Sequence, residues 1–145
     1  MGLPGAGKST VSQKLFEGFA HLCADTIKET HPDYDPKNPE LVHKWSMEIY
    51  DERFEDILKD DGSWIVDGTG TNAEKMIQRI RKAKLAGFEV EVLFVIVPLD
   101  VAIKRNAKRE RSIPERAIRE KAETIYLAFE TVSREADKIT TVYNG

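Results

Sequence analysis

The start of the chain carries the residues best suited to chemistry, because positions 2–10 read GLPGAGKST. This run fills every fixed position of the pattern G-x-x-x-x-G-K-[ST], a phosphate-binding loop. Lys8 can reach the β- and γ-phosphates of a nucleotide, and the Ser9 hydroxyl can ligate Mg²⁺. The alternative is a glycine-rich turn with a chance lysine, which the amphipathic helix pattern that follows disfavours. We therefore expect ATP or GTP, with Mg²⁺, to be bound by Gly2, Pro4, Gly5, Ala6, Gly7, Lys8, Ser9 and Thr10.

Two aspartates follow short apolar runs that could be strands. Asp25 comes after His21–Ala24, where a carboxylate could orient an acceptor hydroxyl and take its proton. A structural alternative is that Asp25 caps the helical turn that starts at Thr26. Asp67 comes after Trp64–Val66 and could support Mg²⁺ directly or through water. Its alternative is a plain strand-to-helix turn.

A basic stretch, residues 104–111 (KRNAKRER), holds five cations in eight positions. Arg105 and Arg109 stand four residues apart and share one helical face, and Arg111 lies just beyond them. Such groups on a lid, about residues 104–113, could stabilise charge on a transferring phosphate. A solvated helix face and a patch for a nucleic-acid backbone are the alternatives.

Strand patterns alternate with helix patterns along the sequence. This alternation predicts one α/β domain over residues 1–145, whose strands and helices position these residues. The fold expected is a P-loop NTPase-type parallel sheet flanked by helices. A phosphate-binding loop normally follows a buried strand. Only Met1 precedes it here, so we expect the sheet to lack that strand, as in a truncated chain or one with a misassigned start. The elements expected are helices at 8–19, 26–30, 40–59, 72–86, from Asp100, and 114–136, and strands at 21–24, 64–66, 89–97 and 139–143.

The net charge of −3 gives no overall attraction to nucleic acid or to a membrane surface. No apolar run approaches the ~18 residues that span a bilayer, so a membrane partner is not expected. The one cysteine, Cys23, cannot form an internal disulfide and fits a reducing, cytoplasmic setting. His21, His31 and His43 are scattered in sequence, and the spacing assigns none of them to a metal.

Taken together, the motifs resemble those of P-loop kinases of the zeta-toxin and polynucleotide-kinase-like group. The segment from Asp25 to Asp35 (DTIKETHPDYD) is very similar to the zeta-toxin segment that starts with the catalytic-base aspartate. Residues 67–70 (DGTG) are similar to the acidic-Gly-Thr-Gly motif of the group, in which zeta toxins often carry Glu first. The lid, with Val97-Pro98 before it and Ile113-Pro114 after it, resembles that of polynucleotide kinases.

The resemblance implies transfer of the γ-phosphate of ATP to an alcohol, with Asp25 as the base and Lys8 on the phosphates. It implies phosphate-binding roles for Arg105 and Arg109 and a lid role for Arg111. The first acceptor expected is a small molecule such as a nucleotide sugar, because zeta toxins phosphorylate UDP-N-acetylglucosamine. A 5′-hydroxyl nucleic-acid end is the second, and a non-catalytic nucleotide-binding remnant is the third reading. An antitoxin protein is a further partner that zeta toxins suggest.

Overall fold

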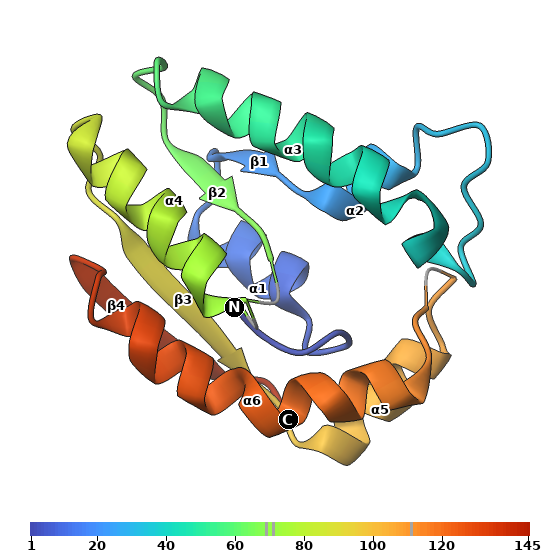
Figure 1. Ribbon diagram of the computed structural model, residues 1–145. Coiled ribbons are helices and arrows are strands. Elements are labelled where there is room, and N and C mark those ends of the chain that lie inside the picture. The colour runs from blue at the N-terminus through green and yellow to red at the C-terminus, as the bar shows by residue number, and fades with distance from the viewer. Residues whose placement is uncertain (69, 71, 111) are drawn as a thin grey trace.

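Short strands alternate with helices in the computed structural model, which describes residues 1–68, 70, 72–110 and 112–145 (Figure 1). The helices are α1 (Lys8–Leu15), α2 (Ala24–Lys28), the 3₁₀ turn η1 (Pro39–Val42), α3 (His43–Ile57), α4 (Ala73–Leu85), α5 (Leu99–Ala107) and α6 (Glu115–Ser133). The strands are β1 (Ala20–Leu22), β2 (Trp64–Val66), β3 (Glu91–Ile96) and β4 (Lys138–Tyr143).

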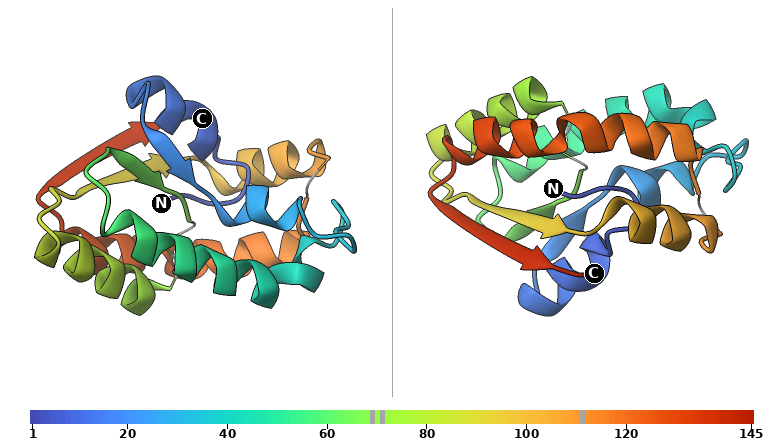
Figure 2. Two further views of the ribbon diagram at one scale, coloured as in Figure 1. Left: turned by 90° about the horizontal axis from the view of Figure 1, so that it is seen from above. Right: turned by 90° about the horizontal axis from the view of Figure 1, so that it is seen from below.

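The strands of the described residues form two separate parallel pairs. β1 pairs with β2, with Ala20 opposite Trp64, and β3 pairs with β4, with Glu91 opposite Lys138. Helices α3, α4 and α6 cover one side of the strands, and α1 lies on the other side (Figure 2). Parallel strands with helices on both faces are the α/β architecture that the alternating pattern predicts, so the fold class is confirmed.

A cleft separates the two strand pairs at the place where a strand leading into the phosphate-binding loop is expected. It is a cavity of about 620 Å³, lined from one side by Ile65 and Val66 and from the other by Leu93 and Val95. Met1 is among the residues that line this cleft. The Met1 nitrogen donates to the Leu93 carbonyl at 2.6 Å, and the Val95 N–H donates to the Met1 carbonyl at 2.9 Å. This is the hydrogen-bond pattern of a parallel strand, reduced to one residue.

The phosphate-binding loop is anchored in the larger core cluster. Leu3 and Ala6 are buried beside Phe94 and Val95 of β3 and Ile118 of α6. A second cluster joins β1 to α2 and α3, and a third packs α4 and α6 against β3. The loop that carries the phosphate motif is therefore fixed to β3. No helix among the described residues is long and apolar enough to cross a membrane.

Several predicted boundaries differ from the structure for local reasons. The first helix ends at Leu15 rather than Phe19, because the chain turns at Gly18 with φ +85°, and Leu15 is half exposed. The helix predicted from Glu40 begins with the turn η1, so α3 starts at His43. Leu41 and Leu85, within the helices predicted at 40–59 and 72–86, are apolar side chains that lie exposed on the surface. The helix predicted from Asp100 is α5; its N-cap residue is Pro98, and Asp100 lies in its first turn. The helix predicted from Pro114 is α6, and Pro114 is its N-cap residue.

Candidate active site

The phosphate-binding loop has a backbone shape that only glycine permits at two positions. Gly5 and Gly7 have φ of +85° and +84°, and the Ala6 N–H donates to the Leu3 carbonyl at 2.9 Å. A Cβ at Gly5 would overlap the backbone of Ala102 on α5. Gly7 is the N-cap residue of α1, so the free N–H groups of the first turn begin there. The loop therefore has the geometry of an anion site at a helix N-terminus.

A residue near the other end of the sequence supports this loop. Asn144 Nδ2 donates to the Ala6 carbonyl at 2.8 Å, and the Asn144 N–H donates to the Ile96 carbonyl at 2.8 Å. The Arg105 guanidinium donates in turn to the Asn144 carbonyl at 2.6 Å. Asn144 thus links the loop, β3 and α5. No local pattern predicts this contact, because Asn144 and Ala6 stand 138 positions apart.

The Lys8 ammonium is buried among the charged groups of the site. Burial lowers the pKa of Lys8, while the carboxylates of Asp67 and Asp25 favour its charged form and the Arg109 guanidinium opposes it. These effects require Asp25, Asp67 and Arg109 to lie within electrostatic reach of the Lys8 ammonium. Lys8 is therefore within electrostatic reach of one charged residue from each of the three other motifs singled out in the sequence.

Ser9 and Asp67 form a pair of hard oxygen donors. The Ser9 hydroxyl donates to Asp67 Oδ2 at 3.4 Å. Burial opposes ionisation of Asp67, but the polar contact with His21 and the charge of Lys8 outweigh it and lower the pKa of Asp67 to about 2. An ionised carboxylate beside a hydroxyl is a donor set that suits Mg²⁺. The residues predicted to support the metal are thus adjacent and in the required charge state.

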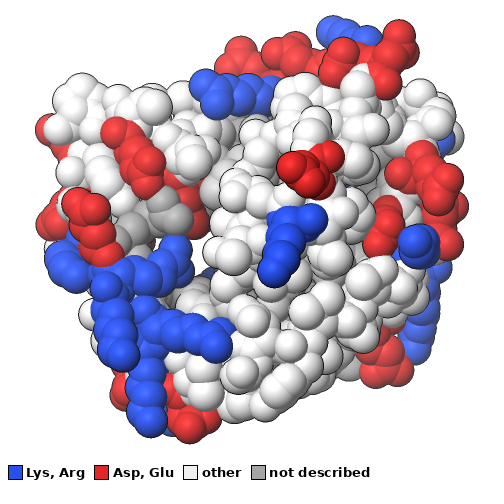
Figure 3. Space-filling model, turned by 180° about the vertical axis from the view of Figure 1, so that it is seen from behind, with Lys and Arg blue, Asp and Glu red and all other residues white. Residues whose placement is uncertain are grey.

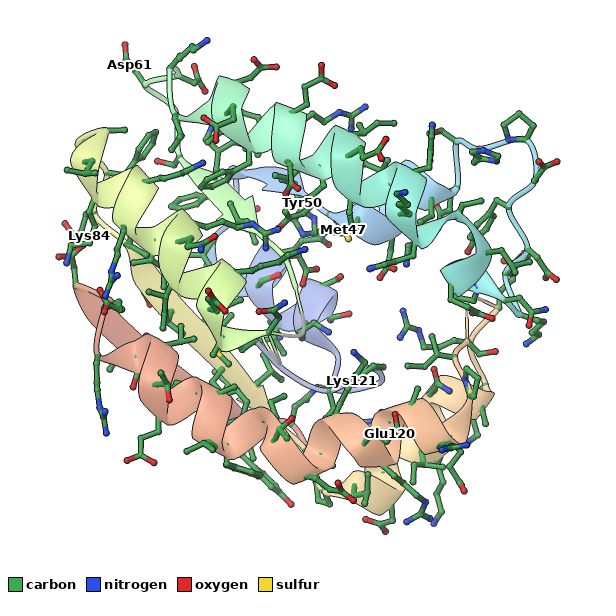
Figure 4. The ribbon with its side chains drawn as sticks, in the orientation of Figure 1. Met47, Tyr50, Asp61, Lys84, Glu120 and Lys121 are labelled. Carbon is green, nitrogen blue, oxygen red and sulfur yellow. The ribbon has the colours of Figure 1, made fainter. Side chains whose placement is uncertain are left out.

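Tyr50 holds the backbone that carries Asp67. It projects from α3 toward the end of β2 (Figure 4), and its hydroxyl donates to the Asp67 carbonyl at 3.0 Å. The guanidinium of Arg79 stacks 4.7 Å from the centre of the Tyr50 ring. Sequence reasoning missed Tyr50, because a tyrosine on the apolar side of a helix looks like any core residue.

Asp25 lies in the first turn of α2 and is partly buried. The N-cap residue of that helix is Cys23, and no side chain makes a capping hydrogen bond there. The interpretation of Asp25 as a helix cap is therefore wrong. Its role as a base remains a prediction.

The lid, about residues 104–113, comprises the end of α5 and the segment that follows this helix. Asn106 closes the segment, donating to the Ile113 carbonyl at 2.7 Å and accepting from the Ile113 N–H at 3.2 Å. Lys37 Nζ donates to the Arg109 carbonyl at 3.1 Å, so the segment also touches the loop before η1. Lysine and arginine side chains gather at this end of the molecule (Figure 3). Arg111, predicted as a further lid arginine, lies outside the described residues.

The two lid arginines differ in their surroundings. Arg109 lies past the end of α5, within electrostatic reach of Lys8, and its phosphate-binding role remains a prediction. Arg105 instead donates to Asn144, behind the phosphate-binding loop. The alternative of a plain solvated helix face does not describe these two residues, because both are partly buried.

Comparison with known proteins connects this site to a family. A curated relative, the L-seryl-tRNA(Sec) kinase of Methanococcus maripaludis, is 27% identical over 137 residues, which are 90% of this chain and 51% of that protein. The chain therefore spans about half the length of that relative. The zeta toxin family matches residues 1–144, which include the phosphate-binding loop, both aspartates and the lid. With nearly every residue covered in order, the chain belongs to the zeta toxin family.

Proposed function

We propose that the protein is a kinase that transfers the γ-phosphate of ATP to a hydroxyl group of a small molecule, such as a nucleotide sugar. One observation carries the proposal. The Ser9 hydroxyl donates to Asp67 Oδ2 at 3.4 Å at the N-terminus of α1, where Gly5 and Gly7 give the phosphate-binding loop its positive φ angles. A phosphate bound on that loop would meet the Lys8 cation and the Asp67 carboxylate that supports the metal, and Asp25 is the proposed base for the acceptor. Membership of the zeta toxin family and the kinase relative support the reaction class.

Each charged or polar side chain of the site has a role in the proposed phosphoryl transfer. The acceptor oxygen forms a bond to the γ-phosphorus, and the bond from that phosphorus to the β,γ-bridging oxygen breaks, leaving ADP. The hydroxyl proton passes to the Asp25 carboxylate. Lys8 and the loop N–H groups hold the β- and γ-phosphates, and Arg109 stabilises charge on the transferring group. When bound, Mg²⁺ would neutralise phosphate charge, and Ser9 and Asp67 are the residues that would hold it.

A second acceptor class has its own support. The relative's name states that it is a kinase of L-seryl-tRNA(Sec), a nucleic-acid-linked acceptor. The cations of α5 lie beside the site and suit a phosphate backbone. A hydroxyl carried by RNA or a 5′-hydroxyl end is therefore the second candidate. The segment from Asp25 to Asp35 favours the small-molecule acceptor, because it is the part most similar to zeta toxins.

The test is transfer of labelled γ-phosphate from ATP to a panel of nucleotide sugars, nucleosides, 5′-hydroxyl oligonucleotides and seryl-tRNA. The acceptor identified is then used with Asp25→Asn, which we expect to slow transfer by about 10²–10⁴-fold while ATP binding is retained. Asp33→Asn, an exposed aspartate in the following loop, is the matched control. Near-normal turnover with Asp25→Asn would exclude Asp25 as the base. ATP binding without transfer to any acceptor would favour a nucleotide-binding protein without catalysis.

A further inference from the structure

A histidine, a cysteine and a carboxylate meet beside the proposed magnesium site. One ligand atom from each of His21, Cys23 and Asp67 lies within 4.8 Å of the other two. His21 Nε2 is 3.3 Å from Asp67 Oδ2. All three side chains are largely shielded from solvent, and Cys23 is only 7% exposed. No other chemistry proposed for the site uses His21 or Cys23.

The strands explain why these residues meet. His21 and Cys23 stand two positions apart on an extended chain, so their side chains share one face. Leu22, between them, faces the opposite way and packs in the cluster with Tyr50 of α3. β2 pairs in parallel with β1, and the Asp67 N–H donates to the Leu22 carbonyl at 2.9 Å. Asp67 is therefore held beside Cys23 by the backbone, not by a flexible loop.

The cluster leaves one buried nitrogen without a well-formed hydrogen bond. His21 Nε2 is buried and makes no hydrogen bond with the described residues, despite its approach to Asp67. A buried nitrogen of this kind costs stability unless something binds it. Nitrogen, sulfur and oxygen ligands together are the set that Zn²⁺ prefers. Ligand atoms around a tetrahedral Zn²⁺ lie about 3.3–3.8 Å apart, so small side-chain rotations would close the cluster on an ion.

We propose that His21, Cys23 and Asp67 form a binding site for a thiophilic divalent cation, with Zn²⁺ the best fit, and that occupation of this site withholds Asp67 from Mg²⁺. On binding, the Cys23 S–H bond breaks, the proton leaves to solvent and the thiolate sulfur ligates the ion. Ser9 then loses its partner for the magnesium site. The expected consequence is that Zn²⁺ inhibits the protein at concentrations far below those of Mg²⁺. This inhibitory part rests on the proposed kinase function, whereas the binding part does not.

The test of binding uses Co²⁺ as a spectroscopic stand-in for Zn²⁺, on the full chain without nucleotide. We expect sulfur-to-cobalt charge-transfer absorption in the wild type, and its loss when Zn²⁺ displaces the cobalt. Cys23→Ser should abolish the absorption, and His21→Gln should weaken Zn²⁺ affinity at least about tenfold. His43→Gln, an exposed histidine outside the cluster, is the control and should bind like wild type. Circular dichroism of each variant verifies that it is folded, and Cys23→Ala replaces Cys23→Ser if the latter is not.

Three results would overturn the site. These are no cobalt binding by the wild type, cobalt binding without the charge-transfer absorption, and Zn²⁺ affinity that is unchanged in folded Cys23→Ser or Cys23→Ala. The inhibitory part is tested separately by phosphotransfer in Mg²⁺ with increasing Zn²⁺. Inhibition of the wild type but not of the Cys23 variant supports it, and equal inhibition of both contradicts it. A wild type that binds cobalt through sulfur but transfers no phosphate would refute the proposed function and leave the metal site established.

Discussion

The Arg105 guanidinium donates a hydrogen bond to the Asn144 carbonyl at 2.6 Å, and Asn144 Nδ2 donates to the Ala6 carbonyl at 2.8 Å. A lid arginine thus supports the phosphate-binding loop from behind through the penultimate residue of the chain. Arg109 lies past the end of α5, so the predicted helical face shared with Arg105 is wrong, and it is instead within electrostatic reach of Lys8. Two residues that look equivalent in sequence therefore have different surroundings.

This difference predicts different kinetics for the two alanine variants. Arg109→Ala should lower kcat more than it weakens ATP binding, because its charge acts on the transferring phosphate. Arg105→Ala should weaken ATP binding and lower Tm as well, because it releases Asn144 from α5. Measurements of kcat, ATP affinity and Tm on both variants check this. Lys104→Ala, exposed on the same helix, is the control. Identical effects of the two arginine variants would contradict the distinction.

Lys8 should be required for activity but not for folding. Burial lowers the pKa of Lys8, so keeping its charge is unfavourable in the free protein. We expect Lys8→Ala to abolish phosphotransfer with little loss of Tm. Lys14→Ala, exposed near the end of the same helix, should leave both unchanged. An active Lys8→Ala protein would rule out the phosphate-binding role of the loop.

Tyr50 should act on the magnesium site through the backbone of Asp67. Tyr50→Phe leaves the Asp67 carbonyl without its hydrogen bond in a buried setting, which costs about 1–3 kcal/mol. The expected result is a lower Tm together with a higher Mg²⁺ concentration for half-maximal activity. Tyr126→Phe is the control, because that hydroxyl is on an exposed side chain of α6. A change in Tm with an unaltered magnesium requirement would show that Tyr50 has only a packing role.

Sequence reasoning found the parts of the site that depend on short motifs and on neighbours in the sequence. The loop motif requires glycine at Gly5 and Gly7, and both have the positive φ that the motif implies. Asp67 follows β2 directly, so its place beside Ser9 was predictable from the usual geometry of parallel sheets. The helix predicted at 72–86 is α4, and Asn72 at its start caps it, accepting from the Lys75 N–H at 3.2 Å.

The parts that were missed depend on contacts between distant residues. Asn144 reaches Ala6 only because β4 pairs with β3 and ends beside the loop. His21 and Cys23 carry no metal-binding spacing, and they meet Asp67 only through the parallel register of β1 and β2. The end of the first helix was predicted too late: Val11 packs against the core, whereas Leu15, at the end of α1, is half exposed.

The cleft between β2 and β3 yields a prediction about stability and its pH dependence. The amino group of Met1 lies in that cleft, and burial lowers its pKa from 8.0 to about 5. A folded-state pKa below the unfolded value means that stability is complete above about pH 8 and falls as the pH is lowered toward 5. Three pKa units correspond to about 4 kcal/mol. We therefore expect the Tm of the 145-residue chain to drop markedly between pH 8 and pH 5.

An engineered extension before Met1 should remove this dependence and add stability. An extension turns the amine into an amide, which keeps the hydrogen bond to the Leu93 carbonyl but cannot be protonated. About six β-branched apolar residues would also fill the cavity and pair with the facing edges of β2 and β3. A Gly/Ser extension of equal length is the control, since it removes the amine but has no side chains to bury. Both variants should lose the decline in Tm between pH 8 and pH 5, and only the apolar one should have a higher Tm at pH 8. If the two extensions give the same Tm at every pH, the cleft does not accept a strand, and the two sheet halves are stable as they stand.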